Sequence, residues 1–165
     1  MHAVARDEQV LARATQARLQ TVLDKAPQGV LVCTAEEMLY VNQALARIHG
    51  YDSAQEFRKT GAYAPYVHPD DREMVIGRGK ARMSNRHAPQ QYEYRFLRAD
   101  GSSGWMECNA TATTWDGQPT SLSWLTDITA RKHAEEALRR SERLFSKVFH
   151  ENPDIVTLST LDEGR

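Results

Sequence analysis

The sequence has few cysteines and no long apolar run, and both features narrow its class. Cys33 and Cys108 are far apart with no Cys-x-x-Cys pair, so we expect free thiols in a reducing compartment. No apolar stretch approaches the roughly 20 residues that cross a bilayer. Residues 1–20 lack the apolar centre of a signal peptide. We therefore expect a cytoplasmic location and no membrane contact by this part of the protein.

A dominant charge sign is also missing. The formal net charge is −1, with 21 Lys and Arg against 22 Asp and Glu. There is thus no general basic field to hold nucleic acid or an anionic membrane. Basic residues between positions 131 and 143 alternate with glutamates, which indicates a solvated helix face. We expect no nucleic-acid partner.

Side chains with catalytic or metal-ligating spacing are scarce. His68 with Asp70 and Asp71 is the one candidate cluster, but Pro69 between them is typical of a helix start with acids in its first turn. No His, Cys or Asp group has the spacing of metal ligands. We therefore expect no metal site and no enzyme activity in this chain by itself.

What is present alternates between helical and strand patterns. Helices are expected at 7–25, 43–49, 54–59, 69–84 and 130–150, and strands at 30–34, 38–42, 91–98, 104–114 and 120–127. Pro27 ends the first helix, Asn42 can cap the second, and two Asp-Gly pairs turn the later strands. The order predicts an α+β domain with an antiparallel sheet and helices on one side.

Alternation along the strands predicts which side chains face the helices. Trp105 and Trp124 are expected on the outer face, beneath residues 10–23. Small inward residues opposite large aromatic ones can leave a cavity, whereas native cores seldom keep voids, so an open and a filled pocket are both compatible with the sequence. The candidate pocket residues are Leu31, Cys33, Asn42, Tyr51, Phe57, Met74, Tyr92, Tyr94, Phe96, Met106, Cys108, Ala110, Ser123 and Leu125.

The last long helix carries an apolar seam on a charged background. Ala134, Leu138, Phe145 and Val148 follow heptad-like spacing that Ser141 interrupts. Leu11 on the first helix has no evident partner within the domain either. Since an isolated amphipathic helix is marginal in water, we expect these five apolar residues to join two chains as a weak, parallel homodimer.

The end of the chain resembles its beginning. A helix, a proline and an apolar strand occur in that order around Pro27 and again, at a constant offset, around Pro153. The repeat predicts that residues 151–165 open a second copy of the same domain, in a chain taken from a longer protein.

Four motifs in sequence order resemble the PAS sensory family. They are Asn42 with Gly50-Tyr51, the segment Val67-His68-Pro69-Asp70-Asp71-Arg72, Glu93-Tyr94-Arg95 with Asp100-Gly101 and Trp105, and Asp127-Ile128-Thr129 before Arg131. The resemblance covers roughly residues 18–150. It implies a five-stranded sheet that cups short helices around a pocket, between N-terminal and C-terminal signalling helices. It also implies a sensor upstream of an output domain, commonly a histidine kinase or a diguanylate cyclase of bacterial signal transduction.

The resemblance further implies a division of labour. Residues 1–26 would be a flanking helix, 27–129 the PAS domain and 130–150 a linker helix. Asp127, Ile128 and Thr129 would transmit the signal, since in this family the matching aspartate ties the exit to the domain.

Cofactors can be judged on the same resemblance. Flavin and haem are not expected, because residues 60–67 lack the cysteine of flavin-binding relatives and residues 70–84 lack a histidine. His68 and His87, on either side, read as a cap and a surface residue. An unknown small ligand, or a pure dimerisation module with a filled core, are the two alternatives.

Overall fold

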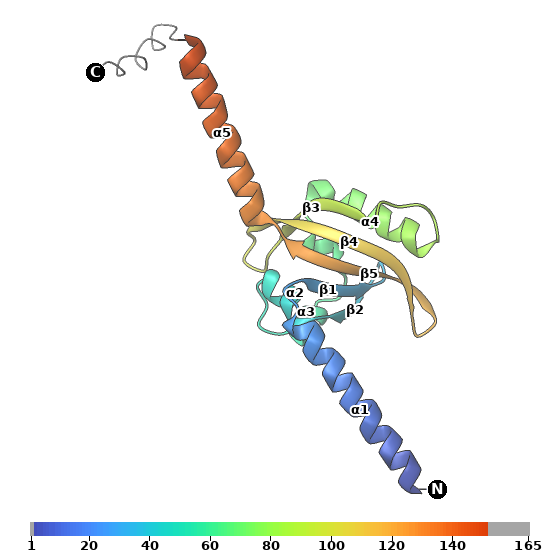
Figure 1. Ribbon diagram of the computed structural model, residues 1–165. Helices are drawn as coiled ribbons and strands as arrows, with labels where there is room; N and C mark the ends of the chain where they lie inside the picture. Colours follow the sequence, from blue (N-terminus) through green and yellow to red (C-terminus); the bar gives the residue numbers. More distant parts are fainter. Residues whose placement is uncertain (1, 152–165) are drawn as a thin grey trace, which may run out of the picture. The chain divides into compact units, whose positions relative to one another are not determined.

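The protein is described by a computed structural model, which covers the backbone of residues 2–151 and the side chains of residues 13–149 (Figure 1). The elements are α1 (His2–Lys25), β1 (Gly29–Cys33), β2 (Met38–Val41), α2 (Gln43–Ile48), α3 (Ala54–Arg58), the short 3₁₀ helix η1 (Ala64–Tyr66), α4 (Pro69–Met83), β3 (Gln91–Leu97), β4 (Ser103–Trp115), β5 (Gln118–Asp127) and α5 (Thr129–Glu151). Two units are distinguished, Met1–Ile128 and Thr129–Arg165. The predicted second copy at residues 151–165 lies outside the described residues.

The five strands form one antiparallel sheet in the order β2-β1-β5-β4-β3. The first and last strands are neighbours at its centre, where Gly29 pairs with Leu125 and Cys33 with Ser121. Helix α2 contacts β1, α3 contacts β2, and α4 contacts β3, β4 and β5. The predicted α+β class, with a five-stranded antiparallel sheet, short helices and a helix at each end, is confirmed.

The two faces of the sheet follow the predicted alternation. Tyr94, Met106 and Leu125 are buried, whereas Trp124 on the other face is 39% exposed. The expectation that residues 10–23 cover this outer face is wrong, because Leu19 is 60% and Val22 68% exposed. The hydrogen bonds from α1 to the start of α2 involve Leu23 and Asp24 near its end, and the apolar side chains of Leu19 and Val22 lie in solvent.

Asn42 holds three elements together. Its Oδ1 accepts hydrogen bonds from the backbone N–H groups of Val30 (2.8 Å) and Leu45 (3.0 Å), which anchors β1 and caps α2. Its Nδ2 donates to the carbonyls of Leu23 (2.7 Å) and Gln28 (3.0 Å), at the end of α1 and the start of β1. The side chain is fully buried, so these bonds satisfy an amide that would otherwise be costly to desolvate.

The start of α4 is fixed to β3 through Asp71. Its carboxylate accepts from the Arg95 backbone N–H at 2.7 Å and pairs with the Arg95 guanidinium at 2.8 Å. The Arg95 hydrogen bonds hold the pKa of Asp71 below its ordinary value. Pro69 occupies the first helical turn and the His68 ring accepts from Asp70 N–H, as the helix-start motif predicts.

Strands β4 and β5 continue as a two-stranded hairpin beyond the rest of the sheet. The β3–β4 ladder reaches Asn109 and the β1–β5 ladder reaches Ser121, so residues 113–115 and 118–120 pair only with each other among the described strands. Asp116 (φ 49°) and Gly117 (φ 79°) both take the left-handed conformation that a two-residue turn of type I′ requires.

The unit that begins at Thr129 contains α5, whose apolar side chains are exposed. The exposed fractions are 62% for Leu138, 59% for Leu144, 66% for Phe145 and 51% for Val148. Within residues 2–151, no helix is long and apolar enough to span a bilayer.

Candidate ligand-binding site

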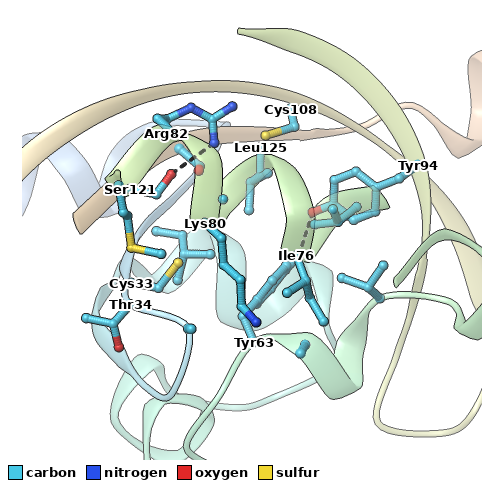
Figure 2. A pocket seen from close by; sticks show the side chains of 18 of the residues that line it. Cys33, Thr34, Tyr63, Ile76, Lys80, Arg82, Tyr94, Cys108, Ser121 and Leu125 are labelled. Atoms are coloured by element: carbon cyan, nitrogen blue, oxygen red, sulfur yellow. Dashed lines mark hydrogen bonds between the residues drawn. The ribbon is translucent and has the colours of Figure 1, made fainter. Parts of the chain in front are cut away.

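A cavity of about 80 Å³ lies between α4 and the inner face of the sheet (Figure 2). It is lined by Leu31, Cys33, Thr34, Ala35, Tyr63, Ala64, Val67, Val75, Ile76, Gly79, Lys80, Arg82, Met83, Tyr92, Tyr94, Cys108, Ser121, Ser123 and Leu125. The sheet contributes residues of alternating parity, and α4 contributes residues three or four positions apart, as each element's period requires. Because Lys80 lines the cavity and is itself exposed, the cavity reaches the surface beside an ammonium group.

Half of the side chains predicted for the pocket meet in this cavity. They are Leu31, Cys33, Tyr92, Tyr94, Cys108, Ser123 and Leu125. The other half lie elsewhere: Asn42 ties α1 to β1 and α2, Tyr51, Phe57 and Phe96 pack in an aromatic cluster, Met106 and Ala110 are fully buried in the core, and Met74 packs half-buried against it. The structure therefore contains a filled region as well as an open one, and the choice between a ligand and a purely structural core stays a prediction.

The aromatic cluster fills the space that α2, α3 and η1 enclose. At its centre is His49, which is fully buried and was not singled out from the sequence. Its ring stacks on Phe57 with 4.9 Å between ring centroids and meets the edge of Phe96 at 5.0 Å. A signal existed, since His49, the C-cap residue of α2, follows the core residue Leu45 by four positions and so lies on the same side as Leu45.

A chain of hydrogen bonds leads from His49 to the cavity wall. His49 Nδ1 lies 2.9 Å from the Leu97 carbonyl oxygen and Nε2 lies 3.0 Å from the Tyr63 hydroxyl, which is 2.9 Å from the Tyr94 hydroxyl. A carbonyl can only accept, so Nδ1 carries the hydrogen and Nε2 accepts from Tyr63. Tyr94 then donates to Tyr63. Each group therefore donates to the next, from Tyr94 to Tyr63 to His49 to the Leu97 carbonyl. These hydrogen bonds connect the cavity to the backbone of β3.

Burial keeps the His49 imidazole neutral. Desolvation lowers the pKa of His49 to about 4, against a smaller raising effect of its hydrogen bond to Leu97. Both ring nitrogens are engaged, and His49 is not among the residues that line the cavity. Among the described residues, no group of three His, Cys, Asp or Glu side chains could hold a metal ion.

The thiol and phenol groups that line the cavity are uncharged. Burial raises the pKa of the Cys33 thiol to about 12 and also raises the pKa of Cys108 and of the Tyr63, Tyr92 and Tyr94 hydroxyls. At neutral pH these five groups are therefore uncharged hydrogen-bonding groups.

Arg82 brings a positive charge to the same wall, and the sequence reading missed it. Arg82 is 7% exposed. Its guanidinium donates to the Pro89 carbonyl at 2.9 Å and to Ser121 Oγ at 3.4 Å (Figure 2). A signal was present in the spacing, because Arg82 follows Val75 by seven positions and so lies on the cavity face of α4. Charged residues are so seldom buried that this position reads as solvent-facing from sequence alone.

The junction between β5 and the exit helix is pinned to β3 and β4. Arg98, directly after β3, pairs with the Asp127 carboxylate at 2.9 Å. Ile128 is 7% exposed and donates its N–H to the Trp105 carbonyl at 2.9 Å. Thr129, the third residue predicted to transmit a signal, is the first residue of α5. Their part in transmission stays a prediction.

Comparison with known proteins gives one family match and several relatives. The family model described as PAS fold matches residues 38–126, more than half of the chain. The two-component sensor PprA of Pseudomonas aeruginosa is 26% identical over 165 residues, which is 95% of this chain and 17% of that protein. The chain thus spans about a sixth of that relative.

Solved structures agree with the family match. A sensory box histidine kinase/response regulator from Burkholderia thailandensis is 27% identical with a TM-score of 0.58, over 79% of this chain and 98% of that one. The PAS domain of an HTR-like protein from Haloarcula marismortui, 20% identical, has a TM-score of 0.56 over 75% of this chain and 99% of that one. This second likeness shows the shared fold. With the strand order, the four motifs and the family match in agreement, the chain belongs to the PAS family.

Proposed function

We propose that this chain senses a small ligand in the cavity beneath α4 and passes the bound state through the β5–α5 junction to an output domain. The observation that carries the proposal is the cavity itself, which packing leaves open next to a well-filled aromatic cluster. Native cores seldom keep such space, so a cavity with hydrogen-bonding groups on its wall favours a ligand over a purely structural role.

The route of transmission follows from contacts already described. Tyr94 on the cavity wall is hydrogen-bonded through Tyr63 and His49 to the Leu97 carbonyl, and the next residue, Arg98, holds Asp127. A ligand that shifts Tyr94 would change the geometry of these linked hydrogen bonds and would shift the β5–α5 junction between two conformational states. The relatives named as a two-component sensor and a sensory box histidine kinase make a kinase the output that we favour.

Filling the cavity tests the sensory role. Ser123 is 6% exposed and lines the cavity, so Ser123→Leu places three more carbon atoms in the space that a ligand would take. In the longer protein we expect output that no longer responds to the signal. Thr111→Leu, at an exposed position of the same sheet, is the matched control and should respond normally. Output that tracks the signal in Ser123→Leu as in the wild type would count against the proposal.

We further propose that the chain acts as a parallel homodimer through its terminal helices. Leu138, Phe145 and Val148 of α5 are all more than half exposed, and Leu19 and Val22 of α1 are exposed as well. Exposed apolar side chains at heptad-like spacing suit an identical helix, because the same seam serves both partners. The predicted contacts of Ala134 and Leu11 belong to this proposal; Ala134 is exposed, while the Leu11 side chain lies outside the described part.

A further inference from the structure

The charge on the cavity wall is unbalanced. Arg82 lies 93% out of solvent, yet no ion pair joins it to a carboxylate among the described residues. Of the residues that line the cavity, two are basic (Lys80 and Arg82) and none is Asp or Glu. A buried charge is costly unless a partner of opposite charge compensates it. No carboxylate among the described residues compensates the charge of the Arg82 guanidinium.

The existing bonds of Arg82 leave donors to spare. A guanidinium has five N–H donors in a planar fork, and two hydrogen bonds are described, one of them long at 3.4 Å. A second guanidinium stands nearby: Arg78 lies over the Tyr92 ring at 4.4 Å, and its Nη1 is buried without a hydrogen-bond partner. Both arginines act on the Cys108 thiol, where they lower a pKa that burial raises. Two cations therefore influence this part of the interior.

A loop anchor is the simpler role for Arg82. Its bond to the Pro89 carbonyl ties the end of α4 to the segment before β3, and the negative end of the helix dipole offsets part of its charge. That role would be met by a solvent-exposed arginine at lower cost. It also gives no reason for placing the guanidinium on the wall of a cavity whose other buried polar groups are all neutral.

The rest of the wall decides what kind of anion would fit. Most of it is apolar, with Leu31, Val67, Val75, Ile76 and Leu125 around the open space. A volume of about 80 Å³ has room for a handful of non-hydrogen atoms, on the order of five, at 10–15 Å³ for each water-sized group. A fully hydrated inorganic anion would leave the apolar wall without contacts, whereas a short aliphatic chain would cover it.

We propose that the cavity binds a short-chain aliphatic monocarboxylate, with the carboxylate against Arg82 and the aliphatic part against the apolar wall. This inference rests on the sensory function proposed above and names the chemical class of its ligand. Arginine suits the role because its fork can bind both oxygens of a carboxylate. Lys80, exposed at the edge of the cavity, would favour the approach of an anion from solution.

Calorimetric titration of the wild-type chain with sodium butyrate tests the assignment without any mutation. Butyramide has the same shape and no charge, and inorganic phosphate has charge and no apolar part. With ionic strength held equal by sodium chloride, we expect saturable binding of butyrate, and binding of butyramide and phosphate weaker by about 10-fold or more. Equal binding of butyramide, equal binding of phosphate, or no binding of butyrate would each overturn the assignment.

Variants then locate the charge. Arg82→Met removes the guanidinium but keeps a long side chain, and we expect the dissociation constant for butyrate to rise about 10- to 100-fold while the weak affinity for butyramide is unchanged. Arg86→Gln, an exposed arginine four residues further on, makes the same change of charge and should bind butyrate like the wild type. If Arg82→Met does not fold, Arg82→Lys serves instead and should weaken butyrate binding alone. Unchanged discrimination between butyrate and butyramide in either variant would contradict the role of Arg82.

The two proposals fail in different ways. If butyramide binds as well as butyrate, the cavity takes ligands without using the charge, and the sensory role stands while the carboxylate class is wrong. If Ser123→Leu leaves the output responsive although the wild-type chain binds butyrate, the carboxylate site stands and the sensory role is wrong.

Discussion

His49 is a neutral imidazole held between the Leu97 carbonyl and the Tyr63 hydroxyl in the interior of the domain. Its pKa falls from 6.5 to about 4 on folding because burial penalises the charged ring. The folded state thus stays neutral while the unfolded chain takes up a proton as the pH falls below 6.5. The stability that this group contributes is complete above pH 6.5 and is lost between pH 6.5 and 4.

The expected loss can be measured from urea unfolding at pH 7.5 and pH 4. A pKa difference of this size corresponds to a decrease of about 3 kcal/mol in the free energy of unfolding from this residue. In His49→Gln, which cannot titrate, we expect a lower stability at pH 7.5 but a shallower fall towards pH 4. His87→Gln, at an exposed position, should fall like the wild type. An equally steep fall in His49→Gln would show that the pH dependence comes from other groups.

The same residues show what sequence can and cannot predict at this scale. Asn42 was predicted as a cap because its type and place before a helix suffice for that role, and it also makes bonds to α1 that no local pattern encodes. Arg82 and His49 were missed because polarity assigns such residues to the surface by default. Their burial is set by tertiary packing, and only their spacing from Val75 and Leu45 hints at it.

Among the elements, prediction succeeded where the ends are marked. Pro27, Asn42, Pro69 and the Asp116-Gly117 turn each stand at the boundary that their backbone preferences favour. The 3₁₀ helix η1 was not predicted, since three residues carry no period. The position of the cavity was predicted only in part, because strand alternation specifies the sheet wall while the α4 wall depends on how that helix is rotated.

The junction between β5 and α5 is the element whose stability we expect to be separable from the fold. Asp127→Ala removes the 2.9 Å bridge to Arg98. The side chains of Arg98 and Asp127 are 25% and 29% exposed, so the free energy of unfolding should fall by about 1 kcal/mol at most. Hydrogen exchange should become faster at the Ile128 amide, which donates to the Trp105 carbonyl next to the lost bridge, and unchanged in the β4–β5 ladder. When the chain is joined to the output domain that we propose, the output should no longer follow the signal.

A control separates this effect from a general loss of charge. Asp52→Ala changes an exposed carboxylate on the loop before α3, and it should leave both the Ile128 exchange rate and the output as in the wild type. Normal signal dependence in Asp127→Ala would show that the bridge has no part in transmission.

For the whole molecule, the central question is how two copies meet. Sedimentation of the wild-type chain should show concentration-dependent dimers, since a short seam interrupted by Ser141 pairs weakly. Leu138→Glu with Phe145→Glu places two charges in the seam and should give monomers at the same concentration. His133→Glu with Arg140→Glu adds acids at exposed positions outside the seam and should still dimerise.

The direction of pairing can be tested separately. In a parallel pair identical residues face each other, so Val148→Cys should form a covalent dimer on mild oxidation. The buried Cys108 and half-buried Cys33 should not. A monomeric wild type at high concentration, or a dimeric seam variant, would exclude α5 as the interface.

The hairpin at the end of β4 and β5 bears on a different kind of association. Two paired strands that extend beyond their sheet expose unpaired backbone N–H and C=O groups. These groups can pair with another extended chain and so promote aggregation. Trp115 and Gln118 flank the two-residue turn and exchange the ladder bonds, so the backbone nitrogen of residue 119 faces away from β4. That residue is proline, which has no hydrogen to donate there. The exposed edge of β5 is thereby closed to strand addition at its tip. Edge-to-edge pairing of sheets is discouraged there, in a protein that we propose to pair with its own copy through helices.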